Sequence, residues 1–132
     1  MPTSRQEEKE IKELINKIID AAEKIHKTMG PGLLENAYQT CLNFELKNMG
    51  MEVILGKNCP VKYDGIKIDA GYKIDMIVED RIVIENKTIQ RISSDDEEEL
   101  YTYLKFSGYK VGLLINWRTA LIKQSIKRID CS

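Results

Sequence analysis

A chain of 132 residues with 42% hydrophobic side chains is long enough for one domain with a buried core and leaves little room for a second. Its formal net charge of −1 excludes a strongly basic protein, so any nucleic-acid-binding surface must be local. No stretch approaches the roughly 20 apolar residues that span a bilayer, and the N-terminus lacks the apolar run of a signal peptide. We therefore expect a cytoplasmic protein with no membrane partner.

Cysteine and histidine usage narrows the metal chemistry that one chain can support. Cys41, Cys59 and Cys131 are far apart and show no CxxC spacing, which is typical of free thiols in a reducing compartment. The single histidine, His26, excludes a site built from several histidines of one chain.

Two helices are predicted in the N-terminal part of the chain. Apolar residues recur at steps of three and four from Ile11 to Met29, and residues 1–9 before them are expected to form a polar, loosely ordered start. Gly30-Pro31-Gly32 ends the first helix. The second is expected over residues 33–48, with Gly50 as its C-terminal stop.

Beyond residue 50 the apolar spacing changes to the short runs of β-strands. Asp64-Gly65 predicts a tight turn, and residues 79–81 predict a second strand connection. The expected strands are 53–55, 61–63, 66–68, 72–78, 82–87 and 111–115, the last of them continuously apolar and therefore buried on both faces.

An acidic segment opens a third helix between the last two of these strands. Ser94 and Glu97 fit a capping box, and the acids that follow suit the positive end of a helix dipole. The helix is expected to end near Gly108. Residues 121–129 fit a final strand or a short helix, and we favour the strand.

This order of elements predicts one domain over residues 1–132. The fold class is α/β (α+β), with a mixed β-sheet flanked by two N-terminal helices and by one helix after the strand 82–87.

Two carboxylates and a lysine are expected to converge on the strands 72–78 and 82–87. If residues 79–81 form a three-residue loop, Val78 faces Ile82 and Asp75 lies directly opposite Glu85. Lys87 is two residues beyond Glu85 and shares its face. A two-residue loop would separate the carboxylates, so the prediction depends on the loop length.

Two carboxylates this close repel each other unless a cation lies between them. Mg²⁺ uses one or two carboxylates and several waters, and it supports phosphodiester hydrolysis by stabilising phosphoryl charge and lowering the pKa of a water. Lys87 would orient that water or offset charge in the transition state. The alternative is a surface salt-bridge cluster in which Lys87 pairs with Glu85 or Asp75.

Ordered motifs over residues 18–129 resemble those of the GxxExxY family. Gly32, Glu35 and Tyr38 match its hallmark, and the later matches are PVKYDG at 60–65, GYKID at 71–75, IENK at 84–87, YLK at 103–105, GLLIN at 112–116 and IKRI at 126–129. The family is placed in the PD-(D/E)XK nuclease-like superfamily, so the resemblance implies a restriction-endonuclease-like fold.

The resemblance also implies roles for individual residues. Asp75 and Glu85 would bind Mg²⁺ or Mn²⁺, Lys87 would be the catalytic lysine, and Glu35 would be an extra acidic residue at the metal. Tyr38, Glu99 and Tyr103 are expected at the substrate. On residue type alone, Glu35 and Tyr38 also fit a helix N-terminal acid and a packing aromatic.

Two residues depart from the family pattern. Glu99 stands four residues before Tyr103, where family members commonly carry a glutamine. An ionised glutamate repels a phosphate, so Glu99 is either an obstacle to substrate, a further metal ligand, or a solvated side chain. Asn86 replaces a usual apolar residue and, by strand alternation, requires hydrogen-bond partners in the core.

The sequence therefore predicts a metal-dependent nuclease-like protein that hydrolyses phosphodiester bonds in DNA or RNA. Residues 100–129 contain six cationic and no acidic side chains, which fits a local surface for nucleic acid as the partner. The alternatives are a catalytically inactive nuclease-fold module that binds nucleic acid or a protein, and a structural homo-oligomer; a homodimer is left open.

Overall fold

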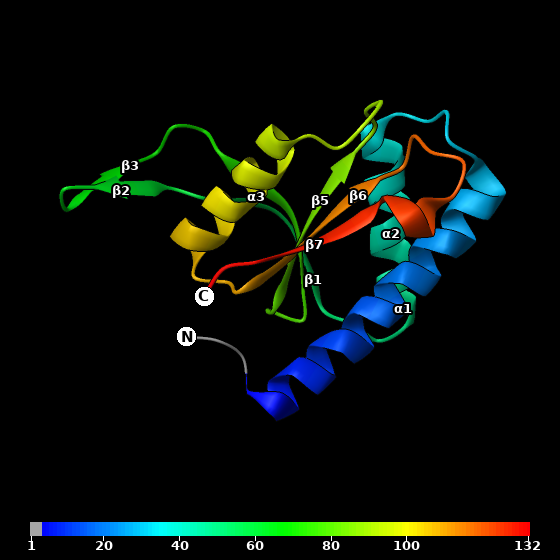
Figure 1. Cartoon of the computed structure of the whole chain (residues 1–132), viewed down its shortest axis with the longest axis horizontal. Helices are drawn as coiled ribbons and strands as arrows, with labels where there is room; N and C mark the ends of the chain where they lie inside the picture. The colour runs from blue at the N-terminus through cyan, green and yellow to red at the C-terminus, as the bar shows by residue number, and fades with distance from the viewer. Residues whose placement is uncertain (1–3) are drawn as a thin grey trace.

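The computed structural model describes residues 4–132, which form a five-stranded sheet with helices on both faces (Figure 1). The sheet has the order β1-β4-β5-β6-β7, in which only β5 and β6 run parallel. The expected mixed sheet is therefore confirmed. Its strands are β1 (Val53–Asn58), β4 (Lys73–Val78), β5 (Ile82–Lys87), β6 (Val111–Asn116) and β7 (Ile126–Asp130).

The helices are α1 (Arg5–Met29), α2 (Glu35–Asn48) and α3 (Ser94–Ser107), with a short 3₁₀ helix η1 (Ile122–Ser125) before β7. Strands β2 (Val61–Tyr63) and β3 (Ile66–Ile68) pair with each other in a hairpin that projects away from the main sheet (Figure 1). None of the described helices is both long enough and apolar enough to cross a membrane.

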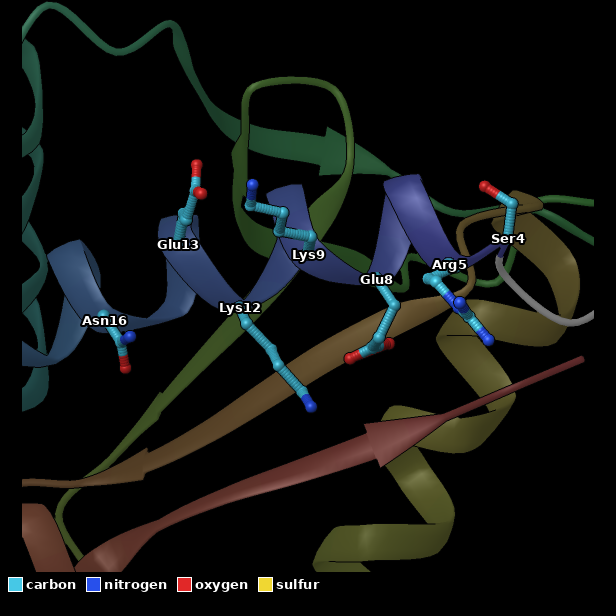
Figure 2. Close-up of a pocket in the computed structure, with 7 residues that line it drawn as sticks. All are labelled: Ser4, Arg5, Glu8, Lys9, Lys12, Glu13 and Asn16. Carbon is cyan, nitrogen blue, oxygen red and sulfur yellow. The ribbon is translucent and has the colours of Figure 1, made fainter.

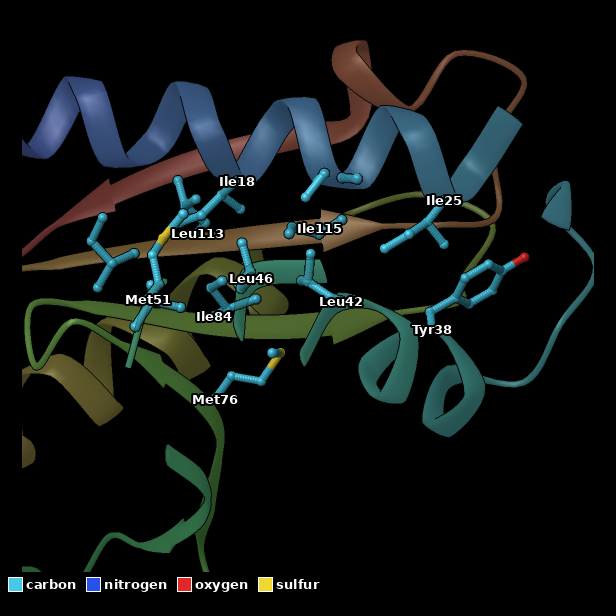
Figure 3. Packing of buried hydrophobic residues seen from close by; sticks show 14 of the residues in the cluster. Ile18, Ile25, Tyr38, Leu42, Leu46, Met51, Met76, Ile84, Leu113 and Ile115 are labelled. Atoms are coloured by element: carbon cyan, nitrogen blue, oxygen red, sulfur yellow. The ribbon is translucent and has the colours of Figure 1, made fainter. Parts of the chain in front are cut away.

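Both faces of the sheet are buried along its central strands β4, β5 and β6. Helices α1 and α2 cover one face, where their apolar side chains pack on alternate residues of the strands; this cluster includes Ile18, Ile25, Leu42, Leu46, Ile84 and Leu113 (Figure 3). Helix α3 covers the other face through Leu100 and Leu104, which pack with Ile77, Val83 and Leu114. Strand β5 is consequently buried along nearly its whole length.

The start of α1 differs from expectation. The predicted loose start over residues 1–9 is wrong from Arg5 onward, because these residues are helical, while residues 1–3 lie outside the described residues. The Ser4 side chain accepts a hydrogen bond from Glu7 N–H and caps the helix. Glu8 points toward β7 (Figure 2), where both terminal nitrogens of Arg128 donate to its carboxylate at 2.7 Å. The Ser4 cap and the bidentate ion pair of Glu8 thus stabilise the first turn of α1, which has no apolar face to bury.

Three other boundaries are corrected. Strand β1 extends to Asn58, because Lys57 and Asn58 pair with β4 although their side chains are polar. The capping box of α3 joins Ser93 and Asp96, one residue before the predicted pair, because two adjacent serines make the register ambiguous. The segment 121–129 contains both alternatives, since η1 precedes β7.

The packing of α3 on the sheet depends on a glycine. A Cβ atom at Gly112 would lie 2.9 Å from Cδ1 of Leu100, which is fully buried. We expect Gly112→Ala to lower the free energy of unfolding by about 1–3 kcal/mol in urea titrations, because Leu100 must shift. The control is Gly32→Ala, where no atom lies within 4 Å of the added Cβ. An equal effect of both substitutions would contradict this packing.

Candidate active site

The loop between β4 and β5 has the length that the carboxylate pair requires. Val78 is paired with Ile82 and Met76 with Ile84, so Glu79, Asp80 and Arg81 form a three-residue connection. Glu79 and Asp80 adopt positive φ angles of 54° and 51°, which turn the chain sharply. The predicted register is therefore confirmed.

Beyond Met76 and Ile84, the carboxyl groups replace the ordinary ladder hydrogen bonds. Asp75 N–H donates to Oε1 of Glu85 at 3.2 Å. Asn86 N–H donates in turn to Oδ2 of Asp75 at 3.0 Å. Each carboxyl is thus tied to the backbone of the neighbouring strand, and the two groups are held together in a fixed orientation.

Glu85 is an unusual acid because it is only 4% exposed. Burial, and next the nearby Asp75 carboxylate, raise its pKa to about 9. Without a cation, Glu85 therefore keeps a proton at neutral pH. A divalent ion would favour the ionised form and release that proton.

The donor set fits a hard divalent cation. Carboxylate oxygens are the ligands that Mg²⁺ and Mn²⁺ prefer, and Mg²⁺ commonly uses only one or two carboxylates with waters and phosphate oxygens completing its shell. Across residues 4–132, no three Asp, Glu, His or Cys side chains are grouped closely enough to hold an ion. Asp75 and Glu85 could supply two such oxygens, and their role as metal ligands stays a prediction.

Glu35, the expected third acid, does not join them in such a group. It begins α2, and its pKa is raised by partial burial and then by the charge of Asp75, so it faces the same region at longer range. Its role as a metal ligand stays a prediction.

Lys87 makes an ion pair, but its partner is neither Glu85 nor Asp75, the two that the salt-bridge alternative predicted. Its Nζ lies 3.1 Å from Oε1 of Glu99 on α3. Burial acts to lower the pKa of Lys87, but the hydrogen bond and charge of Glu99, together with the charges of Glu85 and Asp96, outweigh it and raise the pKa above its ordinary value. The lysine therefore stays charged. Its partner Glu99 is the residue that departs from the family pattern.

Tyr103, one helical turn beyond Glu99, also lies beside the acids. It is 8% exposed, and burial, followed by the charges of Glu99, Glu85 and Asp75, raises the pKa of its phenol. Tyr72 packs edge-on against it with ring centroids 6.3 Å apart. Tyr103 is thus placed at the site, and its contact with substrate stays a prediction.

Tyr38 is not exposed to solvent, so its predicted role at the substrate is not supported. Its ring is fully buried beside Ile25 (Figure 3), and its hydroxyl donates to Gly30 O and accepts from Leu33 N–H. Tyr38 therefore holds the connection between α1 and α2, which is the packing alternative that its residue type allowed.

A buried tryptophan links this aromatic to the site, and the sequence reasoning missed it. The ring of Trp117 stacks on Tyr38 at 4.7 Å between centroids, and its Nε1–H donates to Oδ1 of Asn86 at 2.9 Å. Asn86 also contacts Met76 Sδ at 3.2 Å, so the predicted need for buried partners is confirmed. The available signal was the only tryptophan of the chain, directly after the strand that pairs with β5.

A family comparison agrees with this geometry. A model described as the PD-(D/E)XK nuclease superfamily matches residues 12–129, which contain every residue discussed at the site. The chain belongs to the PD-(D/E)XK nuclease superfamily. Searches of curated proteins and of solved structures found no match. Because PD-(D/E)XK nucleases typically use divalent metals, the family and the donor set agree on the class of ion.

The buried Glu85 makes the stability of this PD-(D/E)XK protein dependent on pH. The pKa of its carboxyl is about 9 in the folded chain, against 4.5 for an ordinary solvated glutamate, so the folded state binds a proton that the unfolded chain releases. Stability should therefore fall as pH rises from about 4.5 to about 9, by at most about 1.4 kcal/mol per unit from this group. We expect Glu85→Gln to flatten that slope in urea titrations with chelator present.

The matched control is Glu98→Gln, because Glu98 is an exposed glutamate of α3. Glu98→Gln should show the same dependence of the free energy of unfolding on pH as the unmodified chain. An unchanged slope in Glu85→Gln would show that Glu85 is ionised in the metal-free protein.

Proposed function

We propose that the protein is a metal-dependent nuclease that hydrolyses phosphodiester bonds in DNA or RNA. The observation that carries the proposal is the arrangement of Asp75, Glu85 and Lys87. Two carboxyl groups are fixed across adjacent strands by reciprocal backbone hydrogen bonds, and a half-buried ammonium follows two residues later. A purely structural ion-pair cluster does not explain a buried acid whose pKa is raised more by the charge of Asp75 than it is lowered by the charge of Lys87.

Each residue would have a distinct role. Asp75 and Glu85 would hold Mg²⁺ or Mn²⁺, which supplies charge for the phosphoryl oxygens and lowers the pKa of a bound water. Lys87 would donate a hydrogen bond to that water or to a phosphoryl oxygen, because it remains protonated at neutral pH. Glu35 would assist at longer range from the start of α2, and Tyr103 would lie at the substrate.

We further infer that the chain belongs to the GxxExxY branch of the superfamily. Gly32, Glu35 and Tyr38 support this inference, since they surround the start of α2. The buried Tyr38 would serve the motif by holding the connection before α2, and Glu35 by facing the carboxylate pair.

Nucleic acid as the partner is supported by the projecting hairpin. Lys62 and Lys67 lie directly opposite each other on β2 and β3, and both are exposed. Like charges in this position destabilise a hairpin. Neither lysine has an ion-pair partner among residues 4–132, so a phosphate backbone would relieve the repulsion.

The proposal is tested by cleavage of labelled single- and double-stranded DNA and RNA with Mg²⁺ or Mn²⁺. We expect Lys87→Ala to reduce the rate by about 10²–10³, the usual cost of losing one group that stabilises transition-state charge. Calorimetric Mn²⁺ binding should persist in Lys87→Ala and be lost in Asp75→Asn, with both variants folded. No cleavage of any substrate by the unmodified chain would contradict the proposal.

One observation favours the second candidate, an inactive nuclease-fold module. Glu99 pairs with Lys87 at 3.1 Å and adds a negative charge where a phosphate must approach. If this pair lowers the cleavage activity without abolishing it, Glu99→Gln should raise the cleavage rate or the substrate affinity. The expected gain is on the order of tenfold, or about 1.4 kcal/mol. A glutamine keeps the side-chain size and can donate to phosphate.

Glu98→Gln is the matched control because it removes the same charge one residue away, on an exposed side chain without an ion-pair partner among the described residues. It should have little effect. If neither the unmodified chain nor Glu99→Gln cleaves while both bind nucleic acid, the inactive module is the correct function.

A further inference from the structure

A polar hollow lies next to the proposed active site and plays no part in the roles assigned above. It has a volume of about 290 Å³ and is lined by residues 90–92, Glu97, Asn116, 118–119 and 124–127. At about 30 Å³ per water molecule, this is the space of roughly ten waters. The hollow can therefore take a group of the size of a phosphate with part of its sugar.

Its position follows from the sheet. Strands β5 and β6 run parallel and end side by side, with Lys87 opposite Asn116. The hollow lies just past these ends, where α/β proteins commonly bind ligands. Asn116 donates to Ile89 O at 2.9 Å and accepts from Ile89 N–H at 3.1 Å, while Trp117 N–H donates to Lys87 O at 2.9 Å. The loop that leads from Lys87 into the hollow is therefore pinned to β6.

Two arginines give the hollow an unbalanced positive charge. Arg91 and Arg118 line it and are exposed, and neither has an ion-pair partner among residues 4–132. By contrast, Arg81 and Arg128 are both paired with carboxylates. The one acid of the lining, Glu97, is already bound to Lys127 at 2.8 Å.

The remaining lining groups are neutral and polar. Gln90, Thr119, Gln124 and Ser125 supply amides and hydroxyls, and Ser125 Oγ donates to Thr119 Oγ1 at 3.0 Å. Planar guanidinium groups accompanied by such donors form a typical site for a phosphate oxyanion. No carboxylate is left unpaired in the lining to oppose it.

We propose that this hollow is a phosphate subsite that holds a backbone phosphate of the nucleic-acid strand being cut, beside the phosphate at Asp75, Glu85 and Lys87. The assignment rests on the proposed nuclease function. The strand passes from Lys87 along the pinned loop, and Arg91 and Arg118 hold its next phosphate. Arg118 belongs to the acid-free stretch 100–129, in which Lys110, Lys127 and Arg128 are already paired with acids.

The test compares Arg91→Gln/Arg118→Gln with Arg5→Gln/Lys9→Gln. The control pair removes the same charge from two exposed residues at the start of α1 that have no ion-pair partner among the described residues. Both are built on Lys87→Ala, which allows binding to be measured with Mg²⁺ present. The readout is the fluorescence anisotropy of short labelled single-stranded and duplex oligonucleotides, titrated over a range of salt concentrations.

We expect the hollow variant to bind at least several-fold more weakly than its parent. Its salt slope should fall by about 0.7 for each lost contact on a single strand, or about 0.9 on a duplex. The control variant should keep the parental slope, and Mn²⁺ affinity should be unchanged in all of them. Competition by inorganic phosphate or a mononucleotide distinguishes a site for a strand phosphate from a site for free phosphate. Only a site for free phosphate would release the oligonucleotide at a low concentration of the small anion.

The outcomes separate this proposal from the nuclease function. Weaker binding in the hollow variant, together with an unmodified chain that cuts nothing, supports the subsite and contradicts the nuclease. Cleavage by the unmodified chain, with an unchanged slope in the hollow variant, contradicts the subsite alone. Equal losses in the hollow and control variants, tight capture of the small anion without oligonucleotide binding, or no oligonucleotide binding at all would also overturn the subsite.

Discussion

The pairing register between β4 and β5 is the constraint on which the site depends. The three-residue loop after Val78 sets Asp75 opposite Glu85, and a shift by one residue would turn one of the two carboxyls to the other face of the sheet. The reciprocal hydrogen bonds to Asp75 N–H and Asn86 N–H then lock the pair. Because both acids bond to backbone, their separation follows from the strands and not from flexible side chains.

The cost of this arrangement is electrostatic. Burying Glu85 beside Asp75 would leave two like charges in a poorly solvated place, and the metal-free protein avoids this by keeping Glu85 protonated. A divalent cation removes the same conflict with the acid ionised. Lys87 offsets the charge of the pair only in part, because its ammonium is hydrogen-bonded to Glu99 and its effect on the pKa of Glu85 is smaller than that of Asp75.

Helix α2, which carries the residues that resemble the GxxExxY hallmark, packs on the face of the sheet opposite the carboxyl pair. Tyr38 of α2 stacks on Trp117, Trp117 donates to Asn86, and the backbone of Asn86 donates to Asp75. These contacts connect the buried face of the sheet to a metal-ligand candidate on the opposite face. They explain how Tyr38 can matter to the motif while its ring is fully buried, because its place is in the packing that orients the strands.

The sequence by itself determined the element order and placed Asp75, Glu85 and Lys87 on one face of two adjacent strands if the loop 79–81 had three residues, because strand alternation is a local property of the chain. The structure supplied that loop length, since Val78 pairs with Ile82. The sequence also indicated that Asn86 required buried partners. Only the tertiary structure decided which partners these are, that Glu99 rather than Glu85 binds Lys87, and that Arg91 and Arg118 share one hollow. These contacts join residues on different elements, and their formation depends on how α2, α3 and the ends of β5 and β6 pack together, which no local pattern encodes.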